Sequence, residues 1–309
     1  MKEYRSYVAW LLGTAAATIA LAATFSVIVD PFGLLGNATW PSGEQDIAYL
    51  INRPLTRIAD LRTSDDSSVN LIIGDSRADQ FSVHDWNELS GEKWLNLGFG
   101  GATLEEMQSM LDYALQRGTP RRVVVVLPFN RFRRSFAVNT VLEAINLARR
   151  PAALFTGVSC LDASFEVLAN SIAGIHFRSA APRMTADKFE QLQYAREVEY
   201  DYSADGLNYA EDIVRQMQVR ARGAGSRLAF LAPPAQDRLL ALYAGKFHEP
   251  FFNVKDYMRR NTFFLDYENT DATQNLQTRL QFKDLVHLTP ESSRKVVAAG
   301  WGQIRSEAD

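Results

Sequence analysis

The sequence predicts an α/β domain in which helices cover a parallel, doubly wound sheet. Short apolar runs bounded by polar residues and glycine, which are typical of buried parallel strands, recur along the chain. Segments with helical apolar periodicity lie between these runs, and strands that alternate with helices form parallel sheets. We expect about five strands, over residues 69–73, 94–97, 122–127, 227–231 and 262–266.

The helix expected over residues 104–117 has the clearest signals for both of its ends. Thr103, followed three residues later by Glu106, forms the pattern of a capping box. Apolar residues then repeat on one face of the helix until Gly118 ends it. A second helix is expected over residues 207–222, before the fourth strand.

Three parts are expected along the chain. Residues 1–30 form a membrane anchor, and residues 31–68 form a connecting segment with one short helix. Residues 69–309 form the α/β domain, whose last helix begins at Pro290, a residue that suits the first helical position. A mostly helical pattern at about 135–200 is longer than a simple crossover requires, so it predicts a helical insertion.

The N-terminal segment contains 22 residues without a charge, residues 8–29, enough for a helix to cross a hydrocarbon core of about 30 Å. Because Lys2 and Arg5 precede this stretch, the chain after it is expected outside the cytoplasm. This predicts a single-pass protein of the inner (cytoplasmic) membrane, with its main domain on the periplasmic or extracytoplasmic side. A cleaved signal peptide is the alternative, since Ala20 and Ala22 resemble a cleavage site, and a buried core helix is a third.

The amino-acid composition argues against nucleic acid as a partner and against a metal site. A net charge of -3 and a pI near 5.9 indicate no general attraction to nucleic acid. Four histidines and one cysteine, Cys160, leave little material for a metal centre, so we expect no metal site. A disulfide within the chain cannot form from one cysteine.

Two polar motifs could together carry nucleophilic catalysis. Ser76 follows Gly74 and Asp75 directly after the first strand, where the turn into a helix would expose its hydroxyl. A serine needs a base that is itself oriented by a third group. Asp284 and His287, three residues apart before the last helix, have the spacing in which the carboxylate can bind one ring nitrogen.

Two further strand ends carry groups that could stabilise an oxyanion. The second strand is followed by a glycine-rich stretch, Asn96 to Thr103, whose backbone can approach a bound carbonyl closely. The third strand is followed by Asn130, whose side-chain amide can donate a hydrogen bond.

In this order the four blocks resemble those of the SGNH (GDSL-type) hydrolase superfamily. The resemblance implies a flavodoxin-like three-layer α/β/α fold and a catalytic triad of Ser76, Asp284 and His287. It also implies an oxyanion hole formed by the backbone N–H groups of Ser76 and Gly101 and by the side chain of Asn130. No cofactor is expected for this chemistry.

The sequence departs from the family pattern around Asn130, where Pro128 and Arg131 replace the usual neighbours. Arg77 follows the serine directly, and we expect Arg77 and Arg131 to bind substrate. With the anchor, the Gly-Asp-Ser-Arg form is similar to membrane-tethered relatives that add or remove acyl groups on surface polymers. The expected function is therefore that of an esterase or O-acetyltransferase acting on an acylated carbohydrate, and a multi-spanning membrane acyltransferase is a candidate partner. The alternative is a non-catalytic accessory subunit that docks such an acyltransferase.

Overall fold

The computed structural model describes residues 2–36, 52–64, 68–135, 137–173, 185–268 and 280–306. Its chain forms two compact units, one of Met1–Ser64 with Thr140–Pro182 and one of Asp65–Asn139 with Arg183–Asp309. The second unit contains the sheet. The predicted helical insertion is divided between them, because its helices up to residue 173 belong to the first unit and its last helix to the second.

The second unit is built on a five-stranded sheet in the order β2-β1-β3-β4-β5. The strands are listed here in sequence order: β1 Asn70–Gly74, β2 Trp94–Asn96, β3 Arg122–Val126, β4 Arg227–Ala232 and β5 Phe264–Asp266. Every neighbouring pair is parallel. This confirms the predicted parallel sheet, and the order is that of a flavodoxin-like doubly wound fold.

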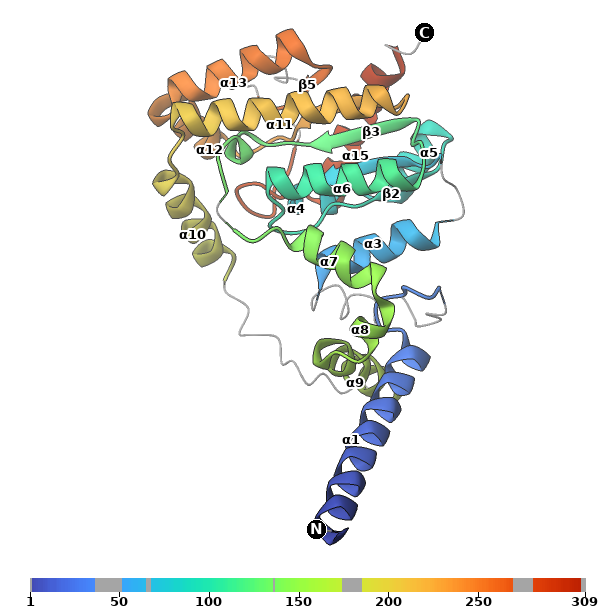
Figure 1. Ribbon diagram of the computed structural model, residues 1–309. Coiled ribbons are helices and arrows are strands. Elements are labelled where there is room, and N and C mark those ends of the chain that lie inside the picture. The colour runs from blue at the N-terminus through green and yellow to red at the C-terminus, as the bar shows by residue number, and fades with distance from the viewer. Residues whose placement is uncertain are drawn as a thin grey trace. The chain divides into compact units, whose positions relative to one another are not determined.

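Helices cover both faces of this sheet (Figure 1). On one face α5 (Val83–Ser90) packs against α15 (Pro290–Ser306), and their apolar side chains share a core with Ile72, Val124 and Leu231. On the other face α11 (Ala204–Gly223) packs against α6 (Leu104–Arg117) and α13 (His248–Asn261). The three-layer α/β/α arrangement follows from burying both faces of a parallel sheet.

The ends of α6 agree closely with the sequence prediction. The Thr103 hydroxyl accepts a hydrogen bond from the Glu106 N–H, and the Glu106 carboxylate accepts one from the Thr103 N–H, at 3.2 and 2.9 Å. These bonds complete the capping box, which satisfies N–H groups that a helix start leaves without partners.

The regular elements described in the first unit are helices. It contains α1 (Lys2–Val29), α3 (Arg53–Thr63), α7 (Thr140–Arg149), α8 (Pro151–Phe155) and α9 (Val158–Ala173). Helix α1 packs against α8 and α9, with the rings of Phe25 and Phe165 at a centroid distance of 4.9 Å. Helix α3 packs against α7, where the Arg62 side chain donates a hydrogen bond to the carbonyl of Ala148.

Candidate active site

Ser76 begins α4 (Ser76–Asp79), a single helical turn at the end of β1. The Asp75 carboxylate caps this turn by accepting a 3.0 Å hydrogen bond from the Arg77 N–H. The turn lies very close to the sheet, because a Cβ at Gly74 would be 2.7 Å from the Ala78 Cβ and 2.8 Å from the Val126 carbonyl oxygen. A glycine before Asp75 is therefore a packing requirement, and it sets the position of the Ser76 turn against the sheet.

The loop after β2 runs beside the Ser76 turn. The Phe99 N–H donates to the Gly74 carbonyl at 3.2 Å, and the Asn96 side chain donates to the Ala78 carbonyl at 2.7 Å. The Ala102 N–H then donates to the Phe99 carbonyl, which closes a turn with Gly101 at a φ of +88°. A positive φ at the third position of a turn favours glycine, so the glycine-rich sequence is explained by the backbone conformation.

A short closed loop before α15 carries Asp284 and His287. Phe282 and Leu288 form an antiparallel bridge, and the Lys283 N–H donates to the His287 carbonyl at 2.7 Å. Gln236, after β4, supports the loop with a side-chain bond to the Asp284 carbonyl at 3.0 Å. Because the bridge joins both ends of the loop, the backbone that carries Asp284 and His287 is fixed at both ends.

The structure brings the three predicted triad residues together. His287 Nε2 lies 2.9 Å from Ser76 Oγ, and His287 Nδ1 lies 2.6 Å from Asp284 Oδ2. The other Asp284 oxygen accepts hydrogen bonds from the Val286 and His287 N–H groups, both at 3.0 Å. A carboxylate can only accept, so the proton of the neutral ring is on Nδ1, and Nε2 is free to accept the Ser76 proton.

The charge state of Asp284 suits this arrangement. Burial acts to raise the pKa of this carboxyl, but the hydrogen bonds from the His287 ring and from the backbone outweigh burial and lower the pKa below its usual range. Asp284 is therefore ionised at neutral pH, where its charge can orient the ring and stabilise an imidazolium.

Asn130 lies in η1 (Phe129–Arg131), the 3₁₀ turn after β3, and it is buried. Its side-chain oxygen accepts a 2.8 Å bond from Arg77, and its amide nitrogen donates a 2.5 Å bond to Glu197 at the end of α10 (Ala186–Glu199). Since an amide carries two N–H hydrogens, the bond to Glu197 leaves the second one for an oxyanion. The role of Asn130 as a donor stays a prediction.

The structure corrects the predicted substrate contact of Arg77. Its side chain is only 3% exposed, and its guanidinium faces Asp75, Asn130 and Glu268. Arg131 is bound to the same region, since its Nε and Nη2 both donate to one oxygen of Asp75, at 3.0 and 2.9 Å. Arg131 is partly exposed, so its contact with substrate stays a prediction, whereas Arg77 points into the protein.

Glu268, just after β5, is the site residue that sequence reasoning missed. Its carboxylate accepts bonds from the Phe129 N–H at 3.1 and 3.3 Å and lies 3.6 Å from Arg77 Nη1. Burial raises its pKa to about 7, while the charges of Lys255 and Arg77 act in the opposite direction. The one sequence signal was its position at a strand end, where ligands bind in parallel sheets.

The raised pKa of Glu268 predicts a pH-dependent stability. The folded protein holds this proton up to about pH 7, whereas the unfolded chain releases it above about pH 4.5. The contribution of Glu268 to the free energy of unfolding is therefore fully present below pH 4.5 and is lost as the pH rises through about 7. The loss is on the order of 3 kcal/mol. Thermal unfolding of the protein at pH 5 and pH 8 measures this difference.

Glu268→Gln is expected to remove most of that pH dependence, because the amide cannot ionise. Asp75 and Asp284 do not complicate the measurement, since their pKa values lie below the usual 3.8. An equal stability loss between pH 5 and pH 8 in the wild type and in the variant would assign the titration to another group.

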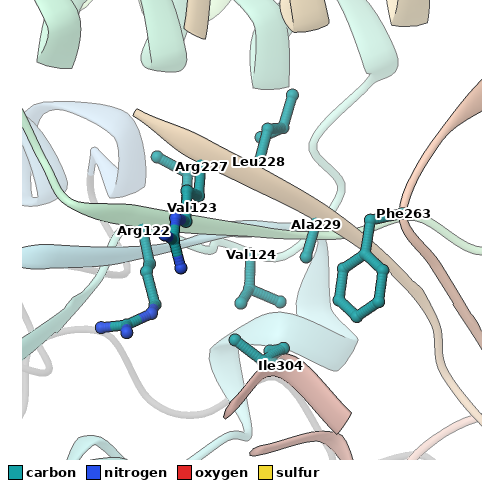
Figure 2. Close-up of a pocket in the computed structure, with 8 residues that line it drawn as sticks. All are labelled: Arg122, Val123, Val124, Arg227, Leu228, Ala229, Phe263 and Ile304. Carbon is teal, nitrogen blue, oxygen red and sulfur yellow. The ribbon is translucent and has the colours of Figure 1, made fainter. Parts of the chain in front are cut away.

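A cavity lies at the opposite end of the sheet, away from these residues. It is lined by the first residues of β3 and β4, beginning at Arg122 and Arg227, together with Phe263 and Ile304 (Figure 2). Since parallel-sheet sites form at the carboxyl ends of strands, this cavity is separate from the Ser76 site. It contains none of the predicted site residues.

Comparison with known proteins gives similarity in structure but not in sequence. No protein-family model and no curated protein matches the chain. Among solved structures, a GDSL-like lipase from Bacteroides thetaiotaomicron matches at a TM-score of 0.44 and 13% identity, over 84% of this chain and 98% of the lipase. A putative GDSL-like lipase from Parabacteroides merdae matches at 0.43 and 12%, over 78% of this chain and 96% of that chain.

A third similar structure is a catalytic mutant of an acetylxylan esterase from Geobacillus stearothermophilus. It matches at a TM-score of 0.41 and 13% identity, over 77% of this chain and 94% of the esterase. Because these identities and TM-scores are low, the evidence for an activity of this chain comes from its own site residues. The structure is thus similar to those of GDSL-type lipases and esterases.

Proposed function

We propose that this chain is a membrane-tethered serine acyl-esterase or O-acyltransferase that acts on ester groups of a cell-surface polysaccharide. The observation that carries the proposal is the continuous hydrogen-bonded series from Ser76 Oγ to His287 Nε2 and from His287 Nδ1 to Asp284, at 2.9 and 2.6 Å. A serine in contact with a base that is oriented by a carboxylate is the arrangement of an activated nucleophile.

In the first half of the reaction Ser76 Oγ attacks the ester carbonyl while His287 Nε2 takes its proton. Asp284 stabilises the imidazolium that forms. The tetrahedral intermediate then collapses, the carbon–oxygen bond to the alcohol breaks, and His287 returns the proton to the leaving oxygen. The product is an acyl group on Ser76 and a free alcohol.

The second half repeats these steps with a new nucleophile. His287 removes a proton from water or from a sugar hydroxyl, whose oxygen attacks the acyl carbonyl. The bond to Ser76 Oγ then breaks, His287 returns the proton to Oγ, and the product is a free acid or a new ester. Water gives a hydrolase and a hydroxyl gives a transferase, so access of water to the site decides between them. In both halves the developing oxyanion is assigned to the backbone N–H groups of Ser76 and Gly101, with Asn130 as a third donor.

Attachment to the membrane is supported by α1. Tyr4–Val29 contains an 18-residue window with a mean hydropathy of 2.0, and the helix is long enough to cross a bilayer. Near its start, Tyr4, Tyr7 and Trp10 are exposed, and such residues are enriched where a helix meets the membrane surface. A signal sequence passes the same test of length and composition, but here the end of α1 packs against α8 and α9, which supports retention of the helix.

The proposed location supports the choice of substrate class and partner. An anchor that crosses the cytoplasmic membrane keeps the site on its outer side, where surface polysaccharides emerge. Acyl transfer there requires a donor group delivered across the membrane, and a multi-spanning membrane acyltransferase fits that role. Arg131, partly exposed beside Asp75, is a candidate contact for an acidic sugar.

The function is tested with a serine-directed fluorophosphonate on the detergent-solubilised protein. Covalent labelling, together with release of acetate from an acetylated polysaccharide, is the expected result. Adding a soluble oligosaccharide acceptor then separates the two activities, because a transferase moves the acetyl group to the sugar. A folded protein that is neither labelled nor active would favour the non-catalytic accessory subunit.

The membrane assignment predicts the result of reporter fusions after Leu35. Alkaline phosphatase fused there is expected to be active, because this reporter folds only outside the cytoplasm, and a green fluorescent reporter at the same position is expected to be dark. The protein should sediment with membranes and retain residues 8–29. A soluble mature protein that begins near Ala23 would instead establish a cleaved signal peptide.

A further inference from the structure

Arg77 connects three of the loops that form the site. Its Nε lies 3.6 Å from Asp75 after β1, its Nη2 donates a 2.8 Å bond to Asn130 after β3, and its Nη1 lies 3.6 Å from Glu268 after β5. These loops are far apart in the sequence, and a single planar guanidinium reaches all three.

Each of these contacts acts on a group next to the proposed chemistry. Asp75 caps the helical turn that begins with Ser76, so its position sets that of the nucleophile. Asn130 accepts from Arg77 through its oxygen and donates to Glu197 through its nitrogen, which allows only one orientation of the amide. The Glu268 carboxylate accepts a hydrogen bond from the N–H of Phe129, the residue before Asn130.

Burying the Arg77 charge costs free energy of folding, and packing alone does not explain why an arginine is buried here. Its side chain is 3% exposed, and Nε and Nη1 make no hydrogen bond to any described residue, only the two ion pairs at 3.6 Å. A buried charge of this kind contributes little net stability, and an apolar side chain of similar size often does as well or better. The presence of Arg77 is therefore better explained by positioning of the neighbouring site residues than by a contribution to stability.

We propose that Arg77 is a positioning residue, which holds the Ser76 turn and the Asn130 amide in the arrangement needed for attack and oxyanion binding. This inference rests on the proposed function, since it concerns the same site. Arg77 contacts no substrate in this role, and it acts through Asp75, Asn130 and Glu268.

Arg77→Lys tests the proposal, because lysine keeps the charge but its compact ammonium cannot reach three partners at once. The rate constants of fluorophosphonate labelling and of turnover (kcat) are expected to fall about 10–100-fold, since small misplacements of reacting groups have effects of this size. KM should change less than threefold. A loss that appears in kcat and not in KM is the signature of misplacement.

Arg122→Lys is the matched control. Arg122 lies at the opposite end of the sheet, is likewise paired with a carboxylate, Glu92, and is 17% exposed at its side chain. The control is expected to lower the melting temperature without changing the labelling rate. Labelling of Arg77→Lys at the wild-type rate would overturn the inference while leaving the proposed function standing, whereas absence of labelling in the wild type would overturn the function itself.

Arg77→Ala with added guanidinium gives a second measurement that does not depend on lysine. Free guanidinium can occupy the space left by the side chain, so labelling is expected to recover at least in part. Labelling of Arg122→Ala is expected to stay at the wild-type rate with or without guanidinium. Failure of guanidinium to restore labelling in a folded Arg77→Ala protein would count against positioning. So would a failure of both Arg77 variants to fold, which would assign Arg77 a structural role.

Discussion

Replacing Ser76 with alanine is expected to abolish fluorophosphonate labelling and to lower ester turnover by on the order of 10⁶-fold. The hydroxyl is the only group that Ser76 contributes to the series of bonds with His287 and Asp284, and no acyl-enzyme can form without it. The fold should persist, because the backbone at this position is held by the Asp75 cap and by the close packing of Gly74. Labelling followed by gel fluorescence, with a thermal melt, measures both effects.

Ser82→Ala is the matched control for this experiment. Ser82 caps α5 in the next loop and accepts a hydrogen bond from the Asp85 N–H at 3.4 Å. Its loss should cost about 1 kcal/mol of stability and leave labelling unchanged. A Ser76→Ala protein that is still labelled at the wild-type rate would show that another residue is the nucleophile.

The second large effect is expected for Asp284→Asn, with a loss of up to about 10⁴ in kcat. The amide of asparagine can donate to Nδ1, which favours the ring tautomer that carries its proton on Nε2. That tautomer cannot accept the proton of Ser76. The shape of the loop should be retained, because the side-chain oxygen can still accept the bonds from the Val286 and His287 N–H groups.

Steady-state kinetics on an activated ester separates this effect from a loss of folding. KM should be nearly unchanged, since Asp284 acts on the histidine and not on the substrate. Asp85→Asn serves as the control, because Asp85 is also nearly buried and pairs with Arg294 at 3.2 Å outside the site. Activity of Asp284→Asn within a few-fold of the wild type would mean that His287 is oriented by some other group.

Local signals in the sequence were sufficient for several elements of the fold. Four valines in a row predicted β3, and the Thr103–Glu106 pair predicted the start of α6, because both depend on residues close together in the chain. The order of the motifs, through its resemblance to the SGNH pattern, also predicted that Ser76, Asp284 and His287 lie together. Their distances, however, required the structure.

The direction of Arg77 and the role of Glu268 were decided by tertiary structure alone. An arginine beside a nucleophile can bind either a substrate or a buried carboxylate. No neighbouring residue in the sequence distinguishes these two contacts. In the structure Arg77 is buried, and its guanidinium meets Asn130 and Glu268 from distant strands. Contacts between residues so far apart in the chain depend on how the strands are arranged in space. The spacing of residues in the sequence does not determine that arrangement.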